Sequence, residues 1–140
     1  MSEIEEAETW LASARVAFGQ DASGRPRYTV VVAQCIHALI RANDALTVRL
    51  LRRRSTRHED AALLFGELVR LKKIPARFSD LRALLVRAVS EKSEYDYKGT
   101  EVSRDVAARW MRQTERFVAR SARFFDEGLQ SSAGLVRAVR

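Results

Sequence analysis

A chain of 140 residues, with 46% hydrophobic and 31% charged residues, has the length and composition of one globular domain. Its single cysteine excludes an internal disulfide and a cysteine-rich zinc site, and a chain of this length can fold without either. No apolar run approaches the roughly 18 residues of a membrane span, and the acidic residues 1–10 do not resemble a secretory signal. We therefore expect a cytoplasmic protein with no membrane segment.

The net charge of +7 is unevenly distributed, because residues 1–20 are net acidic. A strongly basic remainder can indicate a nucleic-acid partner. Only 4 of the 25 basic residues are lysines, however, and a GC-rich bacterial genome produces the same arginine excess independently of function. Charge alone leaves both interpretations open.

Residues 3–19 are predicted to form an amphipathic helix. Ser2 and Glu5 have the spacing of a capping box, and the glutamates of the first turns suit the positive end of the helix dipole. One face of the helix is apolar: Ile4, Ala7, Leu11, Ala14 and Phe18. Gly19 and the polar segment after it are expected to end this helix.

The longest predicted helix covers residues 28–54, which contain neither proline nor glycine and would span roughly 40 Å. Its main apolar stripe is Val32, Ile36, Leu39, Asn43, Leu46 and Leu50, and beside it runs a stripe of smaller residues, Val31, Cys35, Ala38, Ala42 and Ala45. Together these stripes are wide enough for several helices to pack on them. Asn43 interrupts the main stripe, and a buried amide must find hydrogen-bond partners.

The third predicted helix runs from Ser55 or Thr56 to about Lys73. Thr56 and Glu59 have the spacing of a second capping box. Lysines favour a helix C-terminus, and Pro75 prevents the helix from continuing.

Two more helices are expected in the last part of the chain. The first starts at Ser79 and fades in the polar segment 90–100. Ser103 caps the second, which runs to about Glu127 and ends near Gly128. We expect residues 128–140 to form a loose turn or a mobile tail.

No stretch alternates apolar and polar residues over a useful length, so the predicted class is all-α. The expected architecture is an up-and-down bundle of four to five helices built around the long second helix. We expect a single domain over residues 1–140, with its core at about 3–127.

Common catalytic and cofactor motifs are missing from the sequence, which has no glycine-rich phosphate loop, no HExxH and no CxxC. We therefore expect no metal site and no cofactor. His37, Arg41 and Asp44 can line one side of the long helix. His37 could act as a general base oriented by Asp44. We favour the alternative, in which His37 lies at the edge of the core with a hydrogen-bonding partner.

The most basic part of the chain lies at the end of the long helix and in the turn after it. It contains five arginines within nine residues, followed by His58: Arg49, Arg52, Arg53, Arg54 and Arg57. These side chains could contact the phosphates of a nucleic acid. Alternatively, they form a solvated helix end that complements the dipole. No aromatic residues alternate with them, which argues against a platform for stacking single-stranded bases.

Three stretches together resemble the HEPN family of small helical bundles: AQCIHALIRANDALTVRLL, the turn STRHEDAALLFGEL, and EKSEYDYKGTEVS leading into RWMRQTERFVARSARFF. The resemblance covers roughly residues 5–126, and it rests on the order of the helices and turns and on the types of residue within them. It implies a homodimer of helical bundles. Many HEPN proteins are metal-independent ribonucleases, including toxins of toxin–antitoxin pairs and defence proteins. Others are binding modules, often beside a nucleotidyltransferase.

The catalytic motif of this family is an arginine followed a few residues later by a histidine, and this sequence permits two placements. The first is Arg53 (or Arg52) with His58. There the histidine would move protons and the arginine would steady the phosphate. The second placement precedes the last helix, where Ser90 and Tyr95 stand in place of the arginine and histidine and Tyr97 matches a trailing tyrosine.

Three hypotheses follow from these observations. The first, which we favour, is a non-catalytic HEPN-like homodimer that contacts RNA or a partner protein through its basic surface. The second is a metal-independent endoribonuclease that uses Arg53 and His58. The third is a DNA-binding helix–turn–helix, for which the long helix is poorly suited.

Overall fold

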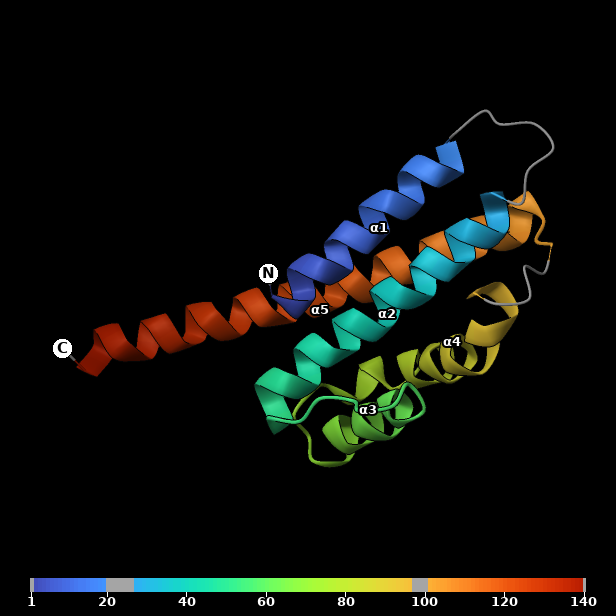
Figure 1. Ribbon diagram of the computed structural model, residues 1–140. Coiled ribbons are helices and arrows are strands. Elements are labelled where there is room, and N and C mark those ends of the chain that lie inside the picture. Colours follow the sequence, from blue (N-terminus) through green and yellow to red (C-terminus); the bar gives the residue numbers. More distant parts are fainter. Residues whose placement is uncertain (1, 20–26, 97–100, 140) are drawn as a thin grey trace.

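The computed structural model describes residues 2–19, 27–96 and 101–139, and it shows an all-helical bundle (Figure 1). Its elements in chain order are α1 (Glu3–Gly19), α2 (Arg27–Leu51), α3 (Asp60–Arg70), a 3₁₀ turn (Ala76–Phe78), α4 (Leu81–Asp96) and α5 (Arg104–Val139). None of the helices in these residues is both long enough and apolar enough to cross a bilayer.

Helix α2 is the centre of the bundle, as the sequence predicts. It packs against α1, α3, α4 and α5, and Figure 1 shows α1 antiparallel to it. Both predicted stripes of α2 are buried in these contacts, apart from Leu50 at the end, which is half-buried. The width of the apolar face explains why this one helix can pack against four others.

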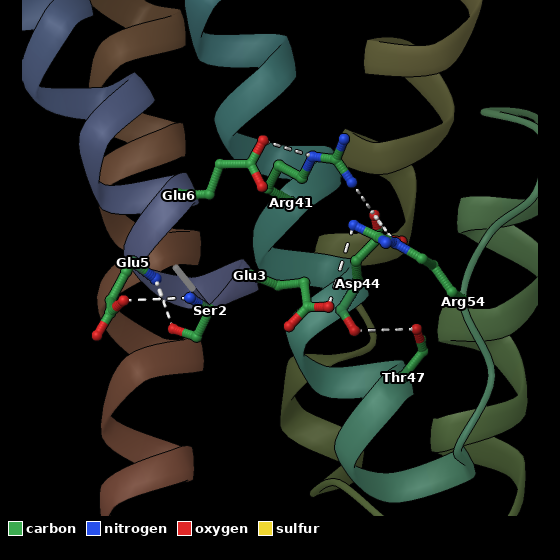
Figure 2. Close-up of polar contacts among 8 residues, drawn as sticks. All are labelled: Ser2, Glu3, Glu5, Glu6, Arg41, Asp44, Thr47 and Arg54. Carbon is green, nitrogen blue, oxygen red and sulfur yellow. Dashed lines mark hydrogen bonds and ion pairs between the residues drawn. The ribbon is translucent and has the colours of Figure 1, made fainter.

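Two predicted helix starts are confirmed by their hydrogen bonds. At α1, the Ser2 backbone N–H donates to Glu5 Oε2 at 3.1 Å and the Glu5 N–H donates to Ser2 Oγ at 3.3 Å, the reciprocal pair of a capping box (Figure 2). At α5, the Val106 N–H donates to Ser103 Oγ at 3.2 Å. These caps are local, because each joins residues three positions apart in the sequence.

The end of α2 differs from the prediction, because the helix stops at Leu51 and not at Arg54. Arg52 has φ 56°, in the left-handed region, so the chain leaves the helix there. Its N–H still donates to the Val48 carbonyl at 3.1 Å. Arg53 and Arg54 therefore belong to a loop, and the geometry of α2 does not set the directions of their side chains.

The predicted capping box of α3 is wrong. The helix begins at Asp60 after Glu59, which makes no side-chain cap, and the Thr56 hydroxyl donates to the Asp60 carboxylate at 3.3 Å. The helix also ends at Arg70, before Lys73. Lys72 has φ 57°, and its N–H and that of the next residue turn back onto helix carbonyls, which is a Schellman-type ending without glycine.

The predicted end of the last helix near Gly128 is also wrong, because α5 continues to Val139. Each glycine inside this helix, Gly128 and Gly134, costs only about 1 kcal/mol relative to alanine, and leucine, glutamine, alanine and arginine residues that favour a helix stand around them. Figure 1 shows this last part of α5 extending beyond the other helices.

Cys35 is fully buried on α2, and its thiol donates to the Met111 sulfur at 3.5 Å. Burial raises the pKa of the thiol to about 12 and outweighs the neighbouring Thr114 side chain, which lowers it. Because the thiolate is the reactive form, we expect no reaction with a thiol reagent at pH 8 in the native protein and full reaction in denaturant. Rapid native labelling would show that the α2–α5 contact opens readily.

Candidate functional site

The arginine cluster (Arg49, Arg52, Arg53, Arg54 and Arg57) lies at the end of α2 and in the α2–α3 loop, residues 52–59. All five side chains are exposed, as is His58. The cluster belongs to one end of the long helix, because α2 stops within it. Arg53, Arg54 and Arg57 follow the end of α2, so the directions of their side chains depend on contacts with other parts of the fold.

Arg53 points towards α3. Its Nη1 lies 3.0 Å from Glu67 Oε2, and Arg70 approaches the other oxygen of that carboxylate at 3.8 Å. Arg53 also lines a shallow pocket of about 360 Å³ against the start of α3. An exposed pair of this kind contributes about 0–1 kcal/mol, but it fixes the direction of the guanidinium.

Arg54, the next residue, reaches the start of α1 instead. Its guanidinium nitrogens lie 4.0 Å from Glu3 Oε1 and 4.0 Å from Asp44 Oδ2 (Figure 2). Arg41 makes a parallel bridge, with Nε 3.1 Å from Glu6 Oε1 and Nη1 3.2 Å from Asp44 Oδ2. Two arginines thus join α1 to one carboxylate of α2.

That carboxylate is the most buried charged group of the site, because the Asp44 side chain is only 3% exposed. Desolvation raises its pKa above the usual value, while Arg41, the neighbouring Ser55 and Arg54 act in the opposite direction. The two arginines and Ser55 therefore only partly offset the cost of burying the charge. Asp44 stabilises the positions of Arg41 and Arg54 at the α1–α2 contact.

A larger pocket, of about 530 Å³, lies between the start of α1 and the end of α2. Arg49, Arg52 and Arg54 contribute to its described lining, together with Glu3. The arginine cluster is thus divided, with Arg53 directed to α3 and three members directed to this pocket. Arg54 lines both pockets.

The Arg53–His58 placement of the catalytic motif lies on exposed loop residues. The described contacts of Arg53 connect it to Glu67, and the His58 carbonyl accepts a hydrogen bond from the Ala61 N–H at 3.1 Å, at the start of α3. Both side chains belong to the α2–α3 loop, but the described contacts of these two residues lead to different parts of α3.

The second placement lies on α4. The Ser90 hydroxyl donates to the Arg87 carbonyl at 3.1 Å, and the Tyr95 ring packs edge-on against Trp110 with centroids 6.4 Å apart. Tyr97 lies outside the described residues. The described part of this segment therefore contributes helix and core contacts.

His37 lies on α2 and stacks on Trp10 of α1, with ring centroids 4.6 Å apart and planes 18° apart. Asp44, its suggested orienting group, is hydrogen-bonded to Arg41 at 3.2 Å. These contacts agree with the edge-of-core interpretation of His37. Asn43 also has a structural role, because its Nδ2 donates to the Ala61 carbonyl at 2.9 Å and joins α2 to α3.

Sequence reasoning missed the contribution of α1 to this site. The sequence assigns Glu3 and Glu6 only to the helix dipole, yet they bind arginines of the second helix and the loop. Their spacing of three residues on an acidic helix start was the available signal, but it does not identify their partners. Within the described residues, no three histidine, cysteine, aspartate or glutamate side chains are grouped to hold a metal ion.

Comparisons with models of protein families, with curated proteins and with solved structures find no match to this chain.

Proposed function

We propose that this protein is a HEPN-like, non-catalytic homodimeric module that binds RNA through the arginine cluster. The supporting observation is the concentration of five exposed arginines at one end of α2. Among the described residues, Arg52 and Arg57 have no acidic partner, so these guanidiniums are available to phosphates. In the proposed assembly, a nucleotidyltransferase or another protein is a further partner.

The test is RNA affinity measured by fluorescence anisotropy over a range of salt concentrations. We expect Arg52→Gln with Arg57→Gln to weaken binding and to reduce the salt slope by roughly 0.7 for each phosphate that the variant no longer binds. Arg112→Gln with Arg116→Gln is the matched control, since it removes two exposed arginines of α5. No binding by the wild type, or an equally large decrease in the control, would contradict the proposal.

The second candidate function is a metal-independent endoribonuclease of toxin or defence type. The exposure of both Arg53 and His58 in one loop favours it. If the protein is the non-catalytic module proposed above, total RNA incubated with the protein and a chelator should stay intact. Cleavage by the wild type that disappears in Arg53→Ala and in His58→Ala would instead establish the enzyme.

The homodimer is tested separately by light scattering. We expect twice the monomer mass at micromolar protein concentration. A monomer mass would remove the dimer from the proposal and leave RNA binding to be judged by its own measurement.

A further inference from the structure

The pocket between α1 and α2 has the size of a small-molecule site. Its volume of about 530 Å³ falls within the roughly 300–1,000 Å³ of typical ligand pockets. It is bounded by the first residues of one helix and the last turns of another, and the Arg54 bridges to Glu3 and Asp44 hold these ends together (Figure 2).

The described lining of this pocket has an apolar part and a charged part. Ile4, Ala45 and Val48 give it an apolar part; Ala45 is buried, and the other two are half-buried. Apolar surface of this kind is stabilised when a ring or a short chain covers it. The pocket therefore offers a place for a small apolar body.

Arginines form the charged part. Among the described lining residues, Arg49, Arg52 and Arg54 are cationic and Glu3 supplies the one carboxylate. Their guanidinium groups can donate paired hydrogen bonds to a carboxylate or a phosphate. Arg52 has no acidic partner among the described residues, and Arg54 meets its two carboxylates only at 4.0 Å. Donors therefore remain for a ligand.

We propose that this pocket binds a small organic anion, whose carboxylate or phosphate group contacts Arg52 and Arg54 while its apolar body covers Val48. This site overlaps part of the proposed RNA contact, because Arg49, Arg52 and Arg54 of the arginine cluster line the pocket, whereas Arg53 and Arg57 do not. Glu3 is an internal competitor for Arg54, so a bound anion displaces it from that guanidinium.

The experiment is an amide NMR titration of the full chain with four probes: phenyl phosphate, benzoate, inorganic phosphate and phenol. We expect saturable shifts at Ile4, Ala45 and Val48 with phenyl phosphate or benzoate. The better of these two should bind roughly fivefold or more tightly than inorganic phosphate or phenol, and their order identifies the preferred head group. Absence of saturable shifts at these amides would overturn the proposal.

Arg52→Gly is the decisive variant. The left-handed φ of Arg52 suits glycine, so the chain folds while the pocket loses one guanidinium. We expect binding of the preferred probe to weaken by about tenfold. Arg112→Gln removes an exposed arginine of α5 that belongs neither to the arginine cluster nor to the described lining of the pocket, and it should leave probe binding unchanged. Equal weakening in both variants would overturn the proposal.

Two further variants test the other walls. Val48→Ser should reduce the advantage of phenyl phosphate over inorganic phosphate, and Glu3→Gln should strengthen anion binding severalfold. Unchanged affinities in both would contradict the assigned geometry. Failure of this proposal can be told apart from failure of RNA binding, because a protein that does not bind RNA is still expected to bind the aromatic anion.

Discussion

Replacing Phe117 with alanine is expected to lower the free energy of unfolding by about 3–5 kcal/mol. Phe117 of α5 is fully buried, and its ring meets that of Phe65 of α3 with centroids 6.0 Å apart and planes at 42°. The substitution removes the ring and leaves a cavity between two helices that are distant in the sequence. Since domains are stable by only about 5–15 kcal/mol, this is a large part of the total.

The measurement is urea unfolding followed by far-UV circular dichroism. Leu63→Ala is the matched control, because Leu63 lies on α3 with 64% of its surface exposed and should change stability by no more than about 0.5 kcal/mol. A cycle with Phe65→Ala should give a coupling of about 0.5–1.5 kcal/mol for the ring pair. A decrease below about 1 kcal/mol for Phe117→Ala would mean that the surrounding helices close the cavity.

Replacing Arg41 with methionine is expected to destabilise the protein by about 2–3 kcal/mol at pH 7. The substitution keeps an apolar stem but removes the closest cation from the buried Asp44 carboxylate. Losing one partner of a buried pair typically costs about 3–5 kcal/mol, and we expect less here because Arg54 and Ser55 remain beside Asp44.

The stability deficit of Arg41→Met should depend on pH, and its direction follows from the raised pKa of Asp44. The folded-state pKa of Asp44 lies above its usual value, so the folded protein holds this proton more tightly than the unfolded chain. The resulting stability is fully present below the unfolded pKa and is lost as the pH rises through the folded pKa. Removing Arg41 raises the folded pKa further. The deficit of Arg41→Met should therefore be small at acid pH and grow as Asp44 ionises.

Unfolding curves from pH 3 to pH 8 test this, with two controls. Glu6→Gln reports the loss of the other Arg41 pair and should cost about 0–1 kcal/mol, because that pair is half-exposed. In an Asp44→Asn background, Arg41→Met should cost no more than this control at any pH. A deficit that does not change with pH, or that persists in the Asp44→Asn background, would show that Arg41 acts through packing.

The helical class, the central second helix and the core residues follow from the sequence by itself. Helix periodicity and the apolar stripes of α2 are patterns of residues three and four positions apart, so they can be recognised in the sequence without knowledge of the fold. The Ser2–Glu5 and Ser103–Val106 caps are local for the same reason. The arginine cluster is equally visible, because composition alone reveals it.

The tertiary structure decided how that cluster is used. Arg53 and Arg54 are neighbours in the sequence, yet one is bound by Glu67 of α3 and the other reaches Glu3 of α1 and Asp44 of α2. The helix ends before both, at a left-handed Arg52, so no helical period fixes their directions. Which carboxylate captures each guanidinium depends on how the helices pack. The pocket between α1 and α2 exists for the same reason, because its walls come from segments that only folding brings together.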